Sequence, residues 1–343
     1  MVGSRIAQCS ARTGGVSDTR SNKVICLVPP GPRDRIARFP AHWEACFVHR
    51  NEDLTVQVTD GARALLTTHP YLVGRAELEL LNGAELVQQV GVGVDNIDIE
   101  AARELGIPVC NVPQANAVSV AEYVIMACIF LLRRMEDATA ALRRLENPYP
   151  ALFARGSHEV RGKKLGLVGY GAIAHEVAKR ARALEMELLS ASAPERERGR
   201  GLAPGAAERE LGVVRLPFEQ LLRESDVISV HVPLTAPTRN MIAAPELALM
   251  KPSAFLVNTS RGGIVDEADL ADALAKGTIA GAAVDVFSVE PVRADNPLLG
   301  APNAFLSPHS GGSTNECVID AIRESIANVD RVLRGEEPHH RVC

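Results

Sequence analysis

The stretch Leu165-Gly-Leu-Val-Gly-Tyr-Gly-Ala-Ile-Ala174 decides the fold, because an apolar strand runs here into a glycine turn and then into a helix. We expect the strand at 165–168 and the helix at 172–184. The helix starts without the Ser, Thr, Asp or Asn that usually caps a helix. A strand, a glycine turn and an uncapped helix, in this order, predict a site that faces an anion.

Each small residue of the turn has a physical role. Gly169 permits the tight turn, Gly171 lets a pyrophosphate approach the backbone, and Ala174 keeps the helix close to the sheet. This is the G-x-G-x-x-G/A dinucleotide fingerprint. The phosphates would lie on the amides of Ala172 and Ile173, at the positive end of the helix dipole. Glycine turns between strand and helix also occur in α/β proteins that bind no dinucleotide, so the rest of the chain must decide.

Composition places the chain among ordinary globular proteins. Its 343 residues suggest two domains, and 46% of the residues are apolar. The formal net charge of −5 gives no basic excess for nucleic acid or for an anionic membrane. The longest apolar run, 124–132, is shorter than the ~20 residues that span a bilayer. We therefore expect no nucleic-acid partner and no membrane segment.

The seven cysteines form no C-x-x-C pair and have no metal-ligand spacing. We expect them to be reduced thiols of a cytoplasmic protein that binds no metal. Residues 1–22 are rich in Ser, Gly, Arg and Thr and lack the apolar core of a signal peptide. We expect this segment to be a mobile leader.

Apolar runs and turn residues predict an alternation of strands and helices from Lys23 onward. From residue 165 the alternation is regular, which predicts a parallel, doubly wound sheet whose ligands bind beyond the carboxyl ends of the strands. We expect strands at 24–28, 54–58, 64–67, 86–90, 109–112, 165–168, 187–190, 227–232, 254–258, 280–286 and 304–306. We expect helices at 99–105, from Ser119 to near Arg134, at 172–184, at 266–275 and over an amphipathic pattern at 318–333.

The segment Gly91-Val-Gly-Val-Asp-Asn-Ile-Asp98 places two glycines directly after a strand. Such a turn exposes backbone amides, as binding of a carboxylate or a phosphate requires. The alternative is that the glycines only accommodate a turn and that Asp98 caps the next helix.

Ser119 and Glu122 have the spacing of a capping box for a helix that is apolar almost all round. Such a helix must be buried, either between domains or against a second subunit.

Three expected strands end in side chains that can carry chemistry, namely Arg261, Glu290 and His309. An Arg binds a carboxylate through two parallel hydrogen bonds, and a His transfers a proton near neutral pH. A Glu bound to that His orients it and stabilises its charged form. Taken singly, Arg261 could form a surface ion pair, and Glu290 could be an acid in a loop before a proline. His309 could be a structural histidine whose ring nitrogens have hydrogen-bond partners within the protein.

With these residues in view, the chain resembles the D-isomer-specific 2-hydroxyacid dehydrogenase family, which includes D-3-phosphoglycerate dehydrogenases and glyoxylate or hydroxypyruvate reductases. The resemblance runs from about Val24 to Val342 and rests on seven motifs in order. They are Gly-Val-Gly-Val-Asp-Asn-Ile-Asp at 91–98, Ser-Val-Ala-Glu at 119–122, Gly-Tyr-Gly-Ala-Ile-Ala at 169–174, His-Val-Pro-Leu-Thr at 231–235, Asn-Thr-Ser-Arg-Gly at 258–262, Val-Asp-Val-Phe-x-x-Glu-Pro at 284–291 and Pro-His-Ser-Gly-Gly at 308–312.

The resemblance implies roles for the substrate-binding and catalytic residues. Arg261 would bind the substrate carboxylate and polarise the 2-oxo group. His309 would exchange the proton with the 2-hydroxyl, and Glu290 would hold His309. The amides of Val92 and Gly93 would bind the other side of the carboxylate.

The resemblance also implies a set of cofactor contacts in addition to the glycine turn. Asp285 would contact the nicotinamide carboxamide, Thr259 would lie beside the nicotinamide ring, and Val232 with Pro233 would border the adenosine. The full expected set is Gly169, Gly171, Ala172, Ile173, Ser192, Arg196, Val232, Pro233, Thr259, Asp285, His309 and Gly311.

The implied fold is α/β, with two doubly wound parallel-sheet domains, Rossmann-like and flavodoxin-like, and an active-site cleft between them. Residues 23–118 and 314–343 would form the substrate-binding domain, and 119–313 the dinucleotide-binding domain. The family also implies a homodimer that forms through the helix at 120–134. The chain ends soon after its last helix, so we expect no regulatory domain there.

One position departs from the family pattern and bears on the cofactor. Sites that select NAD carry an acid about 20 residues beyond the turn, and Ser192 stands there instead. A hydroxyl with Arg196 and Arg198 nearby can accept a 2′-phosphate, so NADP(H) is favoured over NAD(H). The alternative is that Arg196, Arg198 and Arg200 form a solvated loop paired with nearby glutamates.

The sequence therefore predicts an NAD(P)-dependent oxidoreductase that moves a hydride between nicotinamide and C2 of a small D-2-hydroxy or 2-oxo acid. Glu290 argues against the formate-oxidising branch, which pairs its His with an amide. Two alternatives stay open: a dinucleotide-sensing protein like the family's corepressors, and a phosphite-oxidising relative. The sequence does not identify the side chain of the substrate.

Overall fold

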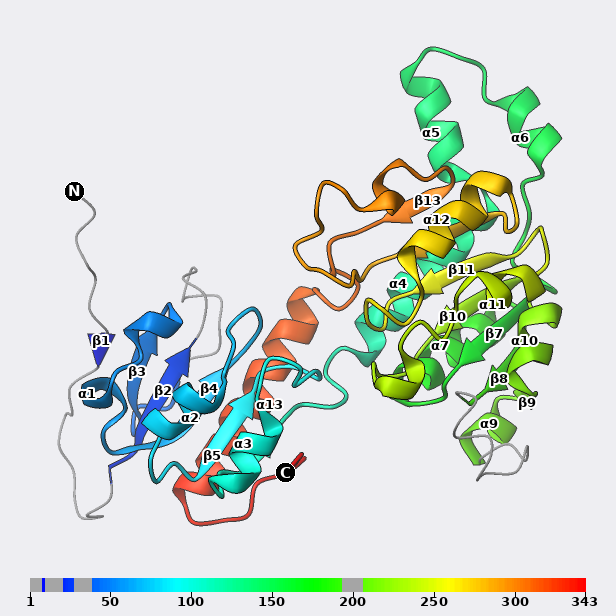
Figure 1. Ribbon diagram of the computed structural model, residues 1–343. Coiled ribbons are helices and arrows are strands. Elements are labelled where there is room, and N and C mark those ends of the chain that lie inside the picture. The colour runs from blue at the N-terminus through cyan, green and yellow to red at the C-terminus, as the bar shows by residue number, and fades with distance from the viewer. Residues whose placement is uncertain (1–7, 10–20, 28–38, 193–205) are drawn as a thin grey trace. The chain divides into compact units, whose positions relative to one another are not determined.

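The structure is a computed structural model that describes residues 8–9, 21–27, 39–192 and 206–343. The chain divides into two compact units (Figure 1). The first comprises Met1–Asn116 and Asn315–Cys343, and the second comprises Ala117–Thr314. Each unit contains its own sheet, flanked by helices.

The sheet of the first unit has the strand order β1-β3-β2-β4-β5-β6. Only β1 is antiparallel to its neighbour, and the others form the 2-1-3-4-5 order of flavodoxin-like sheets. The strands are β1 (Gln8–Cys9), β2 (Lys23–Leu27), β3 (Glu44–Val48), β4 (Ala62–Thr67), β5 (Leu86–Gln89) and β6 (Val109–Cys110).

Helices cover both faces of this sheet, as its continuous apolar strands require. One core contains Leu78 of α2 and Ala101 of α3, and the other contains Val329 and Val332 of α13. The helices are η2 (Asn51–Asp53), α1 (Val56–Thr59), α2 (Arg75–Leu80), α3 (Ile99–Glu104) and α13 (Asn315–Leu333).

Two expectations for this unit are corrected. The predicted strand at 54–58 is wrong, because Thr55 instead caps α1 and its side chain accepts a bond from the amide of Val58. The strand that pairs with β2 is β3, at Glu44–Val48, where we expected none. A short alternation of apolar and polar residues fits either a strand or one turn of helix. Here the cap residue Thr55 favours the helical turn.

The expectation for the cysteines is corrected by a disulfide. Cys26, Cys110, Cys128, Cys317 and Cys343 are free. Cys46 is disulfide-bonded, so the prediction that all seven cysteines are reduced is wrong there.

The second unit contains a seven-stranded parallel sheet in the order β13-β12-β11-β10-β7-β8-β9. Numbered from β7, this is the doubly wound Rossmann order, with the switch point between β7 and β10. The fold class predicted from the sequence is therefore confirmed for both sheets. The strands are β7 (Lys164–Val168), β8 (Glu187–Ala191), β9 (Val214–Arg215), β10 (Val227–Val230), β11 (Phe255–Asn258), β12 (Gly281–Val284) and β13 (Ala304–Leu306).

Separate apolar cores fill the two faces of this sheet. One packs α10, α11 and α12 on the sheet, and the other packs α4 and α7. Helix α12 follows its predicted signals closely: Asp266 accepts two backbone N–H bonds at its start, and Gly277 ends it in the left-handed conformation. The helices are α4 (Ala117–Leu132), α5 (Met135–Arg143), α6 (Tyr149–Arg155), α7 (Ala172–Ala183), α9 (Ala206–Glu210), α10 (Phe218–Glu224), η3 (Ala236–Thr238), α11 (Ala244–Leu249), α12 (Glu267–Lys276) and η4 (Pro297–Gly300).

The predicted capping box of α4 is wrong. The helix begins at Ala117, so Ser119 lies inside it, and the Ser119 hydroxyl bonds to that of Thr314 at 2.8 Å. Glu122 is 3.4 Å from Arg180 of α7 and forms an ion pair with it. A contact 195 residues away in sequence thus takes the place of a local cap.

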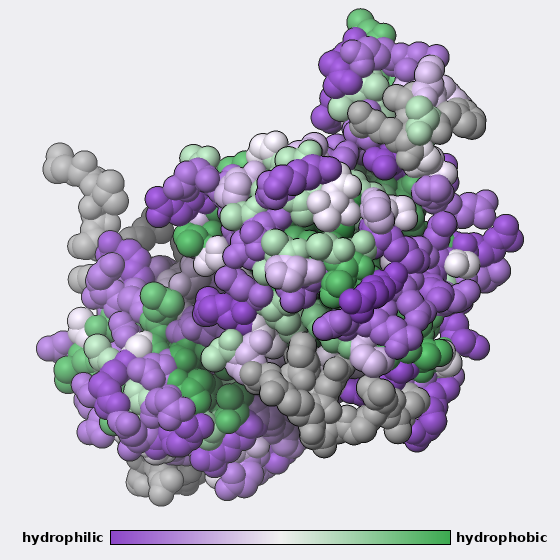
Figure 2. Space-filling view, turned by 45° about the vertical axis from the view of Figure 1, so that its right-hand side comes forward, coloured by the Kyte–Doolittle hydropathy of each residue, from purple (hydrophilic) through white to green (hydrophobic). Residues whose placement is uncertain are grey.

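The face drawn in Figure 2 carries mostly hydrophilic side chains, with apolar ones in smaller groups among them. Within the part of the chain that the structure describes, no helix has both the length and the apolarity needed to cross a membrane.

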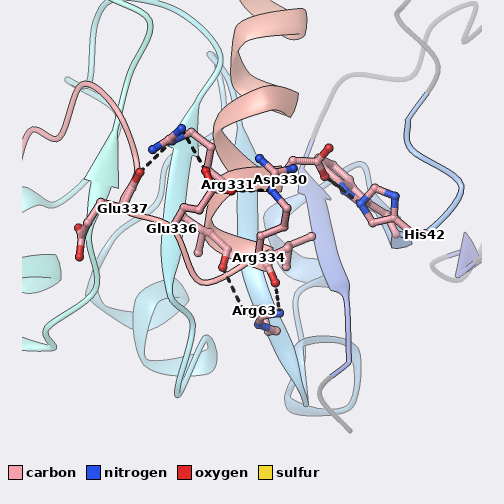
Figure 3. A network of polar contacts seen from close by, with 10 residues as sticks. His42, Arg63, Asp330, Arg331, Arg334, Glu336 and Glu337 are labelled. Atoms are coloured by element: carbon pink, nitrogen blue, oxygen red, sulfur yellow. Dashed lines mark hydrogen bonds and ion pairs between the residues drawn. The ribbon is translucent and has the colours of Figure 1, made fainter. Parts of the chain in front are cut away.

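Figure 3 shows the polar network at the end of α13, in which Arg63 bonds to main-chain carbonyls of the helix end. Its guanidinium bonds both carboxylate oxygens of Glu85 at 2.8 Å and donates to the carbonyls of Val332 and Leu333 at 3.1 and 3.0 Å. The last carbonyls of a helix have no partner within the helix. Arg63 supplies a donor to Leu333 and a second donor to Val332, whose carbonyl also accepts the amide of Gly335 at 2.9 Å.

We predict that Arg63→Met destabilises the first unit by about 2–3 kcal/mol, because it removes these bonds from buried acceptors. The Arg63 side chain is 9% exposed. The matched control is Arg334→Met at the same helix end, where the Arg334 side chain is 56% exposed and pairs with Glu336. The control should cost about 0.5 kcal/mol or less. Urea unfolding followed by the fluorescence of the single tryptophan, Trp43, measures both. Equal effects of the two variants would contradict this account.

Candidate active site

The glycine turn lies at the switch point of the second sheet. Gly169 has φ +90°, a conformation that favours glycine, and its amide donates to the carbonyl of Ala191 at 2.8 Å. A Cβ at Gly169 would lie 2.6 Å from the carbonyl oxygen of His231. The turn therefore needs glycine for both its conformation and its contact with the segment after β10.

The start of α7 is open, as the sequence predicts. Gly171 caps the helix without a side-chain hydrogen bond, and the first turn contains no acid. A Cβ at Gly171 would meet nothing within 4 Å. The first amides of the helix, including those of Ala172 and Ile173, have no partner within the helix and lie at its positive end. These features fit a bound phosphate group.

The segments after β10 and β11 are joined by a side-chain bond. Ser260 donates its hydroxyl hydrogen to the carbonyl of Val232, which is buried, whereas Pro233 is exposed. Thr259 is 8% exposed, and its hydroxyl has no hydrogen-bond partner among the described residues. A buried hydroxyl with no protein partner suits a polar ligand atom.

Arg261 follows β11 in a loop shaped by Asn258, whose role the sequence reasoning missed. The Asn258 amide group donates to the carbonyl of Arg261 at 3.1 Å and accepts from the amide of Ser260 at 3.1 Å. The Arg261 guanidinium itself donates to the carbonyl of Ser260 at 2.8 Å. The Asn258 side chain bonds to the backbone of residues close to it in the sequence. The spacing Asn-x-x-Arg could therefore have predicted this loop.

Gly262 brings the Arg261 loop against the loop that carries Glu290. A Cβ at Gly262 would lie 1.9 Å from the carbonyl carbon of Phe287 and 2.3 Å from the amide nitrogen of Ser288. No side chain fits there. The two backbones can pack this closely only because residue 262 is glycine.

Glu290 and His309 meet directly. His309 Nδ1 is 2.7 Å from Glu290 Oε2, and the other carboxylate oxygen of Glu290 accepts the amide of Phe287 at 2.9 Å. Both side chains are partly exposed, 46% for His309 and 37% for Glu290. Because the bond uses Nδ1, Nε2 is the nitrogen that can exchange a proton with another molecule.

Asp285 holds the loop that carries His309. Its buried carboxylate accepts the hydroxyl of Ser307 at 2.5 Å and the amides of Ser310 and Gly311, both at 2.8 Å. The amide of His309 donates to the carbonyl of Asp285 at 2.7 Å, and His309 itself has φ +54°. In this structure Asp285 therefore fixes the backbone on both sides of His309.

Tyr123 of α4 extends this network, and the sequence reasoning missed it. Ser307 donates its only hydrogen to Asp285, so the Tyr123 hydroxyl is the donor in the bond between Tyr123 and Ser307. Burial raises the pKa of Tyr123 to about 12, which keeps that hydroxyl protonated. The Tyr123 ring stacks on Phe305 with centroids 6.3 Å apart.

His231, the other histidine near the turn, is a poor proton carrier. Burial lowers the pKa of His231 to about 4, so the ring stays neutral near neutral pH. Its Nε2 lies 2.9 Å from the hydroxyl of Ser229.

Ser192 directly follows β8, as predicted, and contacts an arginine that the sequence did not single out. Arg215 of β9 donates from Nη2 to the Ser192 hydroxyl. The predicted phosphate ligands Arg196 and Arg198 lie outside the residues that the structure describes.

Val92 and Gly93 belong to the first unit, in the turn after β5, and both are half-buried. Asn111 donates from its side-chain amide to the carbonyl of Val92 at 2.7 Å and so fixes the turn. Asp98 caps α3 by accepting the amide of Ala101 at 2.9 Å. The alternative role foreseen for Asp98, as a cap, is thus confirmed.

Comparison with known proteins gives a consistent result. Residues 125–311 match the family described as D-isomer specific 2-hydroxyacid dehydrogenase, NAD binding domain. The chain is 38% identical over 286 residues to a D-3-phosphoglycerate dehydrogenase of Methanocaldococcus jannaschii, covering 83% of this chain and 52% of that protein. It is 37% identical to a glyoxylate reductase of Aeropyrum pernix, covering 82% and 84%. The crystal structure of a glyoxylate reductase from Paecilomyes thermophila has a TM-score of 0.79 at 28% identity, covering 94% of this chain and 98% of that one.

The doubly wound sheet with an open glycine turn at its switch point is the arrangement of a dinucleotide-binding domain. The chain belongs to the D-isomer specific 2-hydroxyacid dehydrogenase family. It spans about half the length of the phosphoglycerate dehydrogenase that it matches and most of the length of the glyoxylate reductases.

We predict that Ser307→Ala lowers the stability of the second unit by about 1–3 kcal/mol, because it takes one donor from a buried carboxylate. Tyr123→Phe is the matched control, since it leaves all three donors of Asp285 in place and should cost less. Calorimetric melting of both variants measures the difference. A larger loss in Tyr123→Phe than in Ser307→Ala would contradict the central position given to Asp285.

Proposed function

We propose that this protein reduces small 2-oxo acids to D-2-hydroxy acids with a preference for NADPH over NADH. The observation that carries the proposal is the 2.7 Å bond between His309 Nδ1 and Glu290, beside the close-packed Arg261 loop. Relatives that the chain matches over most of their length are named glyoxylate reductase and hydroxypyruvate reductase. A small, unbranched oxo acid is therefore our first candidate substrate.

The residues of the second unit fit a nicotinamide dinucleotide. The open start of α7 suits the pyrophosphate, and the segment at Val232 suits the adenosine. The buried, unpartnered hydroxyl of Thr259 suits the nicotinamide end. When bound, the nicotinamide supplies the hydride that reduces C2 of the substrate.

Three side chains carry the chemistry in this proposal. Arg261 binds the substrate carboxylate through its planar fork, which holds the acid in one orientation. His309 delivers a proton from Nε2 to the oxygen that becomes the 2-hydroxyl. Glu290 keeps the ring in the orientation that turns Nε2 toward the substrate. The amides of Val92 and Gly93 stay a prediction for the substrate carboxylate.

The cofactor preference rests on Ser192. The position that holds the ribose diol in NAD-selective sites is Ser192 here, so no carboxylate at that position repels a 2′-phosphate. A cytoplasmic location stays a prediction from the sequence.

The test is oxidation of NADPH and NADH, followed by absorbance, with glyoxylate, hydroxypyruvate, pyruvate and 3-phosphohydroxypyruvate. We expect turnover with at least one oxo acid, and faster turnover with NADPH than with NADH. His309→Gln is the control. It removes the proton donor, so turnover should fall about 100-fold or more while dinucleotide binding persists. Tight dinucleotide binding without turnover of any acid would overturn the proposal and favour a dinucleotide-sensing protein.

We further propose that the protein is a homodimer that forms through α4, α5 and α6. In Figure 1, α5 and α6 project away from the sheet of their unit. This region exposes a group of large apolar side chains: Met126, Ile129, Met135, Leu142, Leu145 and Tyr149. Leu145 is 96% exposed, which is unfavourable on a surface that meets only water.

Light scattering after size exclusion tests the dimer. The expected mass is twice the 36.7 kDa of one chain. Leu142→Glu together with Leu145→Glu should shift the mass to that of one chain, because both changes place charges in the apolar contact. A wild-type protein of 36.7 kDa would contradict the proposal.

A further inference from the structure

A second polar cluster lies at the carboxyl end of β8, apart from the His309 loop. Strands β8 and β9 pair in parallel, with Ser190 opposite Arg215. From there the Arg215 side chain reaches Ser192 with Nη2, while Nη1 lies 3.5 Å from Glu208 of α9. The hydroxyl of Ser190 donates to the other Glu208 oxygen at 2.6 Å. Four side chains, from β8 and the residue after it, from α9 and from β9, thus form one network.

Burial makes this network rigid. The Glu208 side chain is 4% exposed and that of Arg215 is 14% exposed. A carboxylate at such depth needs hydrogen bonds and a cation, which Ser190 and Arg215 supply. Arg215 is therefore anchored on one side by Glu208, and its planar guanidinium is held in place before any ligand arrives.

The cluster borders the glycine turn. Tyr170 lies between the two glycines of the turn, and burial followed by the charges of Glu208 and Glu210 raises the pKa of Tyr170 to about 12. The Tyr170 hydroxyl is buried and has no hydrogen-bond partner among the described residues. Gly169 of the turn donates its amide to the carbonyl of Ala191 at 2.8 Å, and Ala191 directly precedes Ser192, so the cluster and the glycine turn are neighbours.

The hydrogen-bond directions at Ser192 favour an anion. The Ser192 hydroxyl accepts a bond from Arg215, so its own hydrogen points elsewhere and can be donated. A ligand beside Ser192 would meet an O–H donor and the outer N–H groups of a guanidinium. An oxyanion with several acceptor oxygens suits this pair, whereas a neutral ribose hydroxyl gains little from the charge.

We infer that Arg215, held on Ser192 and Glu208, is the residue that binds the 2′-phosphate of NADP(H) and sets the cofactor preference. The inference rests on the proposed function, because it presumes that the dinucleotide lies on the α7 turn. It assigns the selective contact to an edge strand of the sheet. The planar fork of Arg215 bonds two phosphate oxygens, and Ser192 donates to the third.

The test measures binding by titration calorimetry, so it does not depend on turnover. The probes are NADP⁺ and NAD⁺, and also 2′,5′-ADP and 5′-AMP, which report the adenosine end alone. The wild-type protein should bind NADP⁺ more tightly than NAD⁺, and 2′,5′-ADP more tightly than 5′-AMP. Arg215→Met should weaken binding of NADP⁺ and 2′,5′-ADP, the two probes with a 2′-phosphate, about 10- to 100-fold, as loss of bonds to a charged group implies. Binding of NAD⁺ and 5′-AMP should weaken less than about threefold.

Further variants separate this role from a purely structural one. Arg215→Met with Glu208→Gln removes the buried charge together with its partner, and should show the same selective loss with a stable fold. Ser192→Asp places a carboxylate at the ribose and against Arg215, and should reverse the preference toward NAD⁺. Arg182→Met is the charge control: Arg182 lies in the last turn of α7 and donates to the carbonyl of Leu211, so all four affinities should stay unchanged.

Three results would overturn the inference. Equal weakening of NADP⁺ and NAD⁺ in both Arg215 variants would show a structural role only, and unchanged NADP⁺ binding would place the phosphate contact elsewhere. Wild-type preference for NAD⁺ would also overturn it, while leaving oxo-acid reduction intact. Absence of turnover with a retained preference for 2′,5′-ADP would instead refute the proposed reaction and support Arg215.

Discussion

The candidate active site depends on the buried carboxylate of Asp285. This group accepts the Ser307 hydroxyl and the backbone amides of the two residues after His309, while the Asp285 backbone accepts the amide of His309 itself. A buried carboxylate with three donors is stable only while all of them stay in place. The position of the histidine is therefore tied to the end of β12, one of the most buried strands of the sheet.

A second constraint places the other two functional side chains beside this loop. Gly262 approaches Phe287 and Ser288 so closely that no Cβ fits, and Glu290 follows three residues after Phe287. The loops after β11, β12 and β13 are therefore packed by backbone contact, and parallel pairing of the three strands places those loops at one edge of the sheet. This packing of the loops is enough to bring the side chains of Arg261, Glu290 and His309 into one region. The carboxyl edge of a doubly wound sheet is the usual place for such a site.

The sequence predicts those strands and helices whose residues are buried in a continuous run. It fails where a bond to a residue far away in the sequence determines the local structure. Strands β7 and β11 each have four consecutive buried residues and were found, and so were the cap and the glycine stop of α12. The supposed strand at 54–58 is instead a helical turn, because Thr55 caps it. Ser119 bonds to Thr314, Tyr123 to Ser307, and Arg215 to Ser192. These bonds depend on the order of helices and strands in space, which local periodicity does not contain.

Most of the candidate site could be inferred from residue types at strand ends, but the side chain of the substrate and the contact of Arg215 with Ser192 could not. The most direct measurement of the central claim uses NADPH carrying deuterium at C4 of the nicotinamide, with the accepted oxo acid and nuclear magnetic resonance of the product. The account predicts deuterium at C2 of the D-2-hydroxy acid, one atom for each NADPH oxidised. Product without deuterium at C2, or of the L configuration, would contradict it.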